Sequence, residues 1–181
     1  MIRQNTMAAK DKFFPRISRF VLSFPLLEAT VKTLQTEGHF EVESILFWAG
    51  TVSGGIATVT DILVPKGPGV FQHPLYIRVD DRIIAALCDV LDPPRLVLLA
   101  QVHTHLEEAF HSPTDDHFSL GTPGLLSVVV PNAAQDRVAR WDEWAFFECL
   151  GGSGFRVIKN GELIERFSIG SHGVGSHEIH G

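Results

Sequence analysis

The sequence predicts an α/β (α+β) fold in a single domain, with a curved mixed β-sheet flanked by helices. A chain of 181 residues, 45% of them hydrophobic, is long enough to bury one sizeable core. Segments of strand-like composition alternate with two amphipathic helical segments. Two almost continuous apolar runs, 95–105 and 125–132, are typical of strands buried on both faces at the middle of a sheet. This pattern predicts helices packed against a central sheet.

The first predicted elements are a strand and a short amphipathic helix. Residues 16–24 form the strand candidate. Pro25 suits the first turn of the following helix, because an N–H at that position would have no intrahelical partner anyway. The helix ends at Gly38. Its apolar face consists of Leu27, Val31 and Leu34.

A hairpin and a second helix come next. Residues 40–50 and 55–65 have strand-like composition, and the turn-prone segment TVSG joins them. Residues 78–92 are predicted to form the second helix, which ends before Pro93 and Pro94. One stripe of that helix is apolar and contains Val79, Ile83, Ala86, Leu87 and Val90.

The remaining strands complete the predicted sheet. The apolar runs 95–105 and 125–132 are its central strands, and 143–150 is a further short strand. Residues 154–169 are predicted to contribute more short strands. The pair Asn160 and Gly161 in this last segment favours a tight hairpin turn.

Both ends of the chain lie outside the predicted domain, which spans residues 16–169. Residues 1–15 show no sustained period and are expected to form a loose N-terminal arm. Residues 170–181 are rich in Gly, Ser and His and cannot bury enough apolar surface to become ordered. We expect a flexible tail there, with solvated histidines that lack the fixed geometry of a metal site.

Composition excludes several classes of partner. The formal net charge is −6, and no stretch clusters Lys and Arg, so a nucleic-acid or anionic-membrane surface is not expected. No segment has the character of a secretory signal or a membrane span. Cys88 and Cys149 are isolated, without a C-x-x-C pairing. These features predict a protein of the reducing cytoplasm.

The segment QVHTHLEEAFHSPTDDHF (101–118) concentrates side chains that can bind metal. His103 and His105 are two residues apart, so their imidazoles emerge on the same face if the strand continues to them. Ser112 and an aspartate follow after a spacer of six residues. Two imidazoles and one carboxylate, with a fourth position left for water, are the ligand set of a catalytic zinc.

Two observations bear on this interpretation. Nine histidines in the chain are enough to produce an H-x-H pair by chance, so the pair alone is a weak signal. Its position is more specific, because the pair lies where an apolar run ends and a polar loop begins, the place where α/β sheets present ligand sites. Either Asp115 or Asp116 can supply the carboxylate. Asp115 keeps the spacing S-x-x-D, whereas counting from the histidines favours Asp116.

The ordered set H-x-H followed by S-x-x-D resembles the JAMM motif of the MPN-plus (JAB, Mov34/PAD-1-like) metalloproteases. That family also carries an early glutamate in the setting E-x-x-x-hydrophobic-hydrophobic-x-G. Glu43 fits this setting, with Phe47, Trp48 and Gly50 after it. Glu41 is the competing candidate, since both glutamates lie on one face of an alternating strand. The resemblance covers roughly residues 16–150, and this constellation is the specific part.

The resemblance implies a role for each of five residues. It assigns His103, His105 and Asp115 as zinc ligands, with water as the fourth. Glu43 would accept a proton from that water and pass it to the leaving amine, and Ser112 would stabilise the oxyanion. It also implies a JAB/MPN domain with a cytidine-deaminase-like core.

Two departures from the family pattern concern the loop after the histidines. Leu106 replaces the proline that usually follows the second histidine, so the exit of the loop is less rigid. The spacer before Ser112 is one residue shorter than in many members. Both departures affect how far the family's site can be carried over to this chain.

The function implied by the resemblance is that of a zinc-dependent isopeptidase or peptidase of the stand-alone prokaryotic type. Its substrate would be the amide bond after the C-terminal tail of a ubiquitin-like or sulfur-carrier-like protein, in deconjugation or precursor processing. Activating and conjugating enzymes of the same pathway are the expected partners. The alternatives are a non-catalytic MPN scaffold or ubiquitin-like-binding module, and a zinc hydrolase of a small-molecule amide.

Overall fold

The computed structural model describes residues 16–38, 41–93, 95–135 and 138–181. For residues 116, 118, 138–140 and 153 it describes the backbone alone. The predicted N-terminal arm, 1–15, lies outside the described residues.

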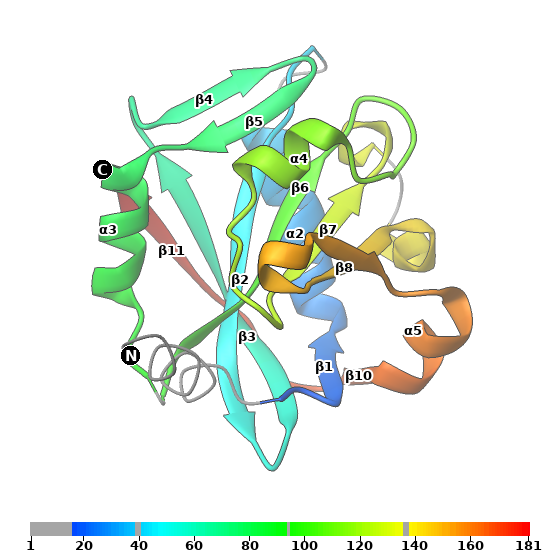
Figure 1. Ribbon diagram of the computed structural model, residues 1–181. Coiled ribbons are helices and arrows are strands. Elements are labelled where there is room, and N and C mark those ends of the chain that lie inside the picture. The colour runs from blue at the N-terminus through cyan, green and yellow to red at the C-terminus, as the bar shows by residue number, and fades with distance from the viewer. Residues whose placement is uncertain (1–15, 39–40, 94, 136–137) are drawn as a thin grey trace, which may run out of the picture.

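Strands and helices alternate through most of the chain (Figure 1). The strands are β1 (Arg19–Ser23), β2 (Ile45–Ser53), β3 (Ile56–Lys66), β4 (Val70–His73), β5 (Tyr76–Val79), β6 (Val97–Thr104), β7 (Leu126–Val130), β8 (Ala145–Cys149), β9 (Phe155–Val157), β10 (Phe167–Gly170) and β11 (Gly175–His180). The α-helices are α2 (Phe24–Glu37), α3 (Asp81–Val90), α4 (Pro113–Phe118) and α5 (Asn160–Arg166). Short 3₁₀ turns are η1 (Asn132–Ala134), η2 (Val138–Glu143) and η3 (Gly151–Ser153).

A mixed, curled sheet forms the centre of the domain, as the sequence predicts. Its strand order is β10-β1-β3-β2-β6-β7-β8-β9, and β11 also pairs with β3. Strand β3 is long enough for β1 to pair along its first part and β11 along its second part. Strand β6 lies at the middle, antiparallel to β2 and parallel to β7. Strands β4 and β5 form a separate two-stranded sheet.

Helices cover both faces of the central sheet. Leu26, Leu27 and Leu34 of α2 belong to the larger core cluster, which also includes Val102 of β6. A smaller cluster contains Leu87 of α3 and residues of β2, β3, β5 and β11. Because successive residues of a strand point to opposite faces, His103 points away from the face that Val102 shares with α2. Helix α4 contacts β5, which contributes Ile77 to the smaller cluster.

The structure corrects the predicted hairpin in 154–169. Asn160 and Gly161 begin helix α5 instead of forming a turn between strands. Leu163 of this helix is buried in the core (6% exposed). Ionic contacts hold the helix in place, because Glu162 pairs with Arg166 at 3.0 Å one turn later and with Arg156 of β9 at 2.7 Å. Tertiary contacts therefore override the local turn preference of the Asn-Gly pair.

The C-terminal segment corrects the prediction of a flexible tail at 170–181. Gly175–His180 form strand β11, which pairs in parallel with the second half of β3. Ile179 is buried (1% exposed), and His177 Nε2 lies 3.0 Å from Asp61 Oδ1. Pairing with an existing strand satisfies the backbone of this segment and so supplies order that its composition does not predict. The ordered domain thus extends beyond residue 169.

Two further differences lie close to the site described below. The hairpin of β4 and β5 and the short helix α4 were not predicted from the sequence. The predicted strand 40–50 begins only at Ile45, so Glu41 and Glu43 precede the strand. None of the described helices is both long enough and apolar enough to cross a membrane.

Gly50 lies at a register shift between strands β2 and β3, and β2 shifts against β6 one residue earlier, between Trp48 and Ala49. A Cβ atom at this position would lie 2.0 Å from the backbone oxygen of Thr58, so only glycine fits. We expect Gly50→Ala to lower the free energy of unfolding by about 3 kcal/mol or more through this backbone clash. Denaturant unfolding followed by circular dichroism measures the change.

Gly161→Ala is the matched control, because a Cβ atom there meets no heavy atom within 4 Å. It adds a methyl group within helix α5 and is expected to change stability by less than about 1 kcal/mol. Equal stability of Gly50→Ala and the wild type would contradict the explanation of the glycine.

Candidate metal centre

Three buried side chains from two elements converge at the end of strand β6. His103 is in the strand, His105 is the residue after its last residue, and Asp115 is in helix α4. One potential ligand atom from each lies within 4.8 Å of the others. Among the described residues, this is the one group of three or more His, Cys, Asp and Glu side chains that meets this criterion.

The carboxylate of Asp115 lies between the two imidazoles. Its Oδ1 is 3.3 Å from Nε2 of His103, and its Oδ2 is 3.3 Å from Nε2 of His105. The two rings have centroids 5.2 Å apart. Both imidazoles thus present Nε2 to the same small volume, as expected for side chains two residues apart on one strand face.

A capping box fixes the position of Asp115. The Oγ atom of Ser112 accepts a hydrogen bond from the backbone N–H of Asp115 at 3.1 Å. In return, Oδ2 of Asp115 accepts from the backbone N–H of Ser112 at 2.6 Å. The spacing S-x-x-D therefore builds the start of helix α4 and holds the carboxylate toward the histidines at the same time.

Neighbouring strands hold the backbone around His105. The N–H of Thr104 donates to the carbonyl of Ser44 at 3.0 Å, and the N–H of His105 donates to the carbonyl of Val130 at 3.0 Å. The carbonyl of His105 accepts from the N–H of Ala133 at 2.8 Å. Ala133 lies in η1, where three consecutive non-glycine residues have positive φ. This sparsely populated conformation brings the N–H of Ala133 against the histidine.

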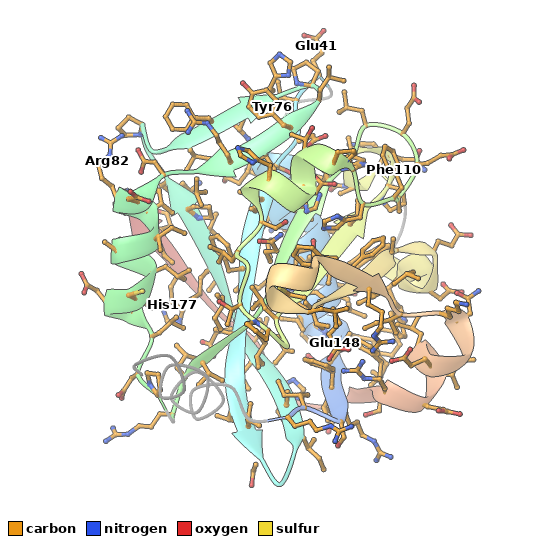
Figure 2. All side chains as sticks on the ribbon, in the orientation of Figure 1. Glu41, Tyr76, Arg82, Phe110, Glu148 and His177 are labelled. Carbon is orange, nitrogen blue, oxygen red and sulfur yellow. The ribbon has the colours of Figure 1, made fainter. Side chains whose placement is uncertain are left out.

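Glu43 reaches the same site from the segment before strand β2. Its side chain is buried (5% exposed), and its Oε1 lies 3.9 Å from Nε2 of His105. Its backbone N–H donates to the carbonyl of His73 at 3.1 Å, and Gln72 donates to its carbonyl at 3.3 Å. The hairpin of β4 and β5 therefore holds the backbone of Glu43. Glu41 is exposed on the outside of the molecule (Figure 2). The structure therefore brings Glu43, and not Glu41, to the histidines.

Burial and neighbouring charges shift the pKa values of the Glu43 and Asp115 carboxyl groups in opposite directions. Burial raises the pKa of Glu43 to about 7, although His105 partly opposes this shift. Burial also acts to raise the pKa of Asp115, but the imidazoles of His103 and His105 hold it well below its usual value. For His105, the effect of Asp115 outweighs burial and raises the pKa of the imidazole. The carboxyl of Asp115 therefore holds its proton more weakly than usual, while that of Glu43 can gain or lose a proton near neutral pH.

The residues present fit a bound metal ion. Nε2 of His103 and Oε2 of Glu43 are buried without a hydrogen-bond partner. Buried polar atoms without a partner are costly, and they are rare in stable proteins. A cation near Nε2 of His103 would satisfy that atom. Two imidazole nitrogens and one carboxylate oxygen form the donor set of catalytic zinc sites.

The structure brings all five predicted site residues together, with Ser112 half-buried beside the ligands. The side chain of Asp116 lies outside the described residues. Sequence reasoning missed the helix in the motif, although S-x-x-D with a proline after the serine is a capping-box signature that could have indicated it. It also missed Gln72, for which the sequence carries no signal, because its hairpin was not predicted.

The loop between the histidines and Ser112 forms one side of the site. Phe110 packs edge-on against His105, with ring centroids 4.7 Å apart, yet is 52% exposed (Figure 2). Glu107 and Glu108 of the same loop are exposed. An exposed aromatic ring next to a buried imidazole offers an apolar contact for a substrate.

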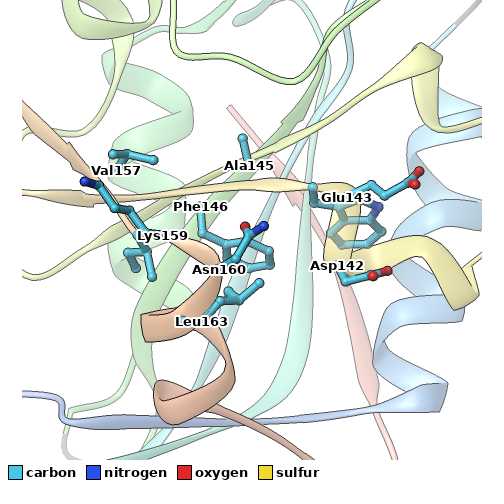
Figure 3. A pocket seen from close by; sticks show the side chains of 11 residues that line it. Asp142, Glu143, Ala145, Phe146, Val157, Lys159, Asn160 and Leu163 are labelled. Carbon is cyan, nitrogen blue, oxygen red and sulfur yellow. The ribbon is translucent and has the colours of Figure 1, made fainter.

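A pocket of about 760 Å³ opens elsewhere, between η2, the end of β9 and helix α5 (Figure 3). Asp142, Lys159 and Leu163 are among the residues that line it. The pocket shares no lining residue with the group of His103, His105 and Asp115, whose ligand atoms could hold a metal ion.

Comparisons with known proteins bear on the reaction class and on the fold. No protein-family model matches the chain. Over 112 residues, the chain is 29% identical to a Sinorhizobium fredii protein named probable metalloprotease y4jG. The matched segment covers 61% of this chain and 67% of that protein. It also resembles the solution structure of a Desulfitobacterium hafniense protein, with a TM-score of 0.57 and 15% identity over 85% of this chain and 94% of the other. The first likeness is to a protein named for metal-dependent proteolysis, and the second is to a shared fold.

Proposed function

We propose that this chain is a zinc-dependent peptidase or isopeptidase of the JAMM type. Its substrate would be the amide bond after the C-terminal tail of a ubiquitin-like or sulfur-carrier-like protein. One observation carries the proposal: a buried His-His-Asp group with converging ligand atoms lies next to a buried glutamate from a segment 60 residues away. The likeness to a protein named as a probable metalloprotease supports the reaction class.

The proposed division of roles follows from the geometry. His103, His105 and Asp115 would hold the zinc ion, which when bound supplies a water of lowered pKa and polarises the substrate carbonyl. Glu43 does not belong to the group whose ligand atoms all lie within 4.8 Å of one another, and its Oε1 is 3.9 Å from Nε2 of His105, so it lies beside the proposed ligands. Its unpartnered Oε2 is free to take a proton from the attacking water and to return it to the leaving amine.

Ser112 would stabilise the oxygen of the substrate carbonyl as negative charge develops on it. Its Oγ accepts one hydrogen bond from the N–H of Asp115. A hydroxyl that accepts a hydrogen bond keeps its own O–H as a donor, so Ser112 can serve the helix and the substrate together. The capping box thereby fixes the distance between this donor and the carboxylate.

The surroundings of Glu43 support the substrate class that we propose. Strands β4 and β5 form a two-stranded sheet of their own, and His73 of β4 accepts a hydrogen bond from the backbone N–H of Glu43. Because this hairpin lies against the segment that carries Glu43, an extended tail laid along it would cross the site. We propose a flexible C-terminal tail of a β-grasp protein as this strand, with activating and conjugating enzymes as further partners in the cytoplasm.

Metal binding is the first test of the proposal. We expect about one zinc per chain by elemental analysis, lost in His103→Ala and in Asp115→Ala because each removes a ligand. His177→Ala, which removes an exposed histidine of β11, is the control for adventitious binding and should keep the zinc. Asp116→Ala should also keep it; an empty Asp116→Ala site beside a full Asp115→Ala site would show that the wrong aspartate was assigned.

The role of Glu43 gives a second test. Glu43→Gln keeps the shape of the side chain but cannot accept the proton, so zinc content should stay near one per chain. The kcat for amide hydrolysis should fall by roughly 10²–10⁴-fold. Glu41→Gln is the matched control and should retain full activity, because Glu41 is exposed outside the site. Full hydrolytic activity of Glu43→Gln would contradict the role of Glu43 as the base, whereas a zinc-loaded wild type without hydrolytic activity would leave only a binding or scaffold role for the site.

The substrate class needs its own experiment. Fusions of a ubiquitin-like and of a sulfur-carrier-like protein to a C-terminal extension should be cut directly after the tail, and a chelator should stop the reaction. Mass spectrometry of the products locates the cut. Hydrolysis of small amides with both fusions left intact would assign the site to a small-molecule substrate instead.

A further inference from the structure

Gln101 is a buried polar residue within an otherwise apolar part of strand β6. It is 4% exposed and lies two residues before His103, so both side chains point to the same face of the strand. A buried glutamine side chain is costly unless its amide is hydrogen-bonded. The hydrogen bonds that Gln101 makes therefore identify the interactions that offset the free-energy cost of burying its amide.

All of its hydrogen bonds go to segments that flank the site. Oε1 of Gln101 accepts from the backbone N–H of Leu120 at 3.0 Å. Its Nε2 donates to the hydroxyl of Ser119 and, at 3.3 Å, to the hydroxyl of Ser127 in β7. One side chain thus joins β6, β7 and the residues that directly follow helix α4.

The link to the site passes through the end of helix α4. The N–H of Ser119 donates to the carbonyl of Asp115 at 2.8 Å, which closes the last turn of the helix. Helix α4 has six residues, and a helix this short is not stable without tertiary contacts. The capping box holds its beginning from within the same segment. Gln101 ties the residues that follow the helix, Ser119 and Leu120, to the strand that carries His103.

We propose that Gln101 is a positioning residue that sets the distance of Asp115 from His103 and His105. It holds the end of helix α4 on the face of β6 that carries His103, so that the carboxylate meets imidazoles from the same strand. The effect of Gln101 on metal binding rests on the proposed function, because it requires that the three side chains bind zinc. The anchoring of helix α4 can be measured without any metal.

A set of three variants tests the proposal. Gln101→Met keeps the length of the side chain and removes every hydrogen bond. Ser119→Ala is milder, because it removes one partner and leaves the bond to Leu120 intact. Ser23→Ala is the control, since it removes the hydroxyl that caps α2 by accepting from the N–H of Leu26 at 3.3 Å, far in sequence from any proposed ligand.

Zinc affinity is measured by competition with a chelator, and hydrogen exchange is measured on the metal-free proteins. We expect Gln101→Met to weaken zinc binding by about 10-fold or more. It should also speed amide exchange in 113–120. The exchange rates of Ser119→Ala should lie between those of Gln101→Met and those of the wild type. Cobalt-substituted Gln101→Met should show an altered visible spectrum. Ser23→Ala should lower the melting temperature. Its zinc affinity, its amide exchange rates in 113–120 and its cobalt spectrum should equal those of the wild type.

The outcomes separate the two proposals. If Gln101→Met and Ser119→Ala bind zinc within twofold of the wild type and exchange at its rate in 113–120, the positioning role is wrong. If Gln101→Met does not fold, Ser119→Ala decides by the same criteria. If the wild type holds no zinc, the proposed function fails, and the exchange rates alone decide whether Gln101 anchors helix α4.

Discussion

The antiparallel pairing of β2 with β6 is the constraint on which the site depends. Its register sets Ile45 opposite His103, so the segment just before β2 ends beside the segment just after β6. Glu43 and His105 meet for this reason, although some sixty residues separate them along the chain. The parallel partner β7 then holds the backbone of His105 from the other side. A central strand paired on both sides provides the rigid support that a catalytic constellation requires.

The convergence of His103, His105 and Asp115 was predictable because residue types and spacing indicate it. H-x-H at the end of an apolar run indicates two imidazoles on one face, and the structure places them so. The spacing S-x-x-D has a second meaning as a capping box, which explains physically why Asp115 faces the histidines. Gly50 is a similar case: the family pattern marks it as a closing glycine, and the structure shows a backbone oxygen where a side chain would be.

Other parts of the fold depend on contacts distant in sequence, which a single chain does not reveal. Strand β11 is ordered by pairing with β3, more than a hundred residues earlier, despite a composition typical of tails. Helix α5 begins at an Asn-Gly pair that favours a turn, because burial of Leu163 and the arginine contacts of Glu162 outweigh that preference. The hairpin of β4 and β5 lies apart from the central sheet, yet it holds the backbone of Glu43 and so contributes to the site.

The proposed zinc ion would lie between β6, helix α4 and Glu43. Anomalous scattering at the zinc absorption edge, from crystals grown with zinc, would locate it. We expect one strong peak about 2.0–2.2 Å from Nε2 of His103, Nε2 of His105 and one carboxylate oxygen of Asp115, with Glu43 beyond bonding distance. A peak held by other residues, or a site that stays empty at saturating zinc, would contradict it.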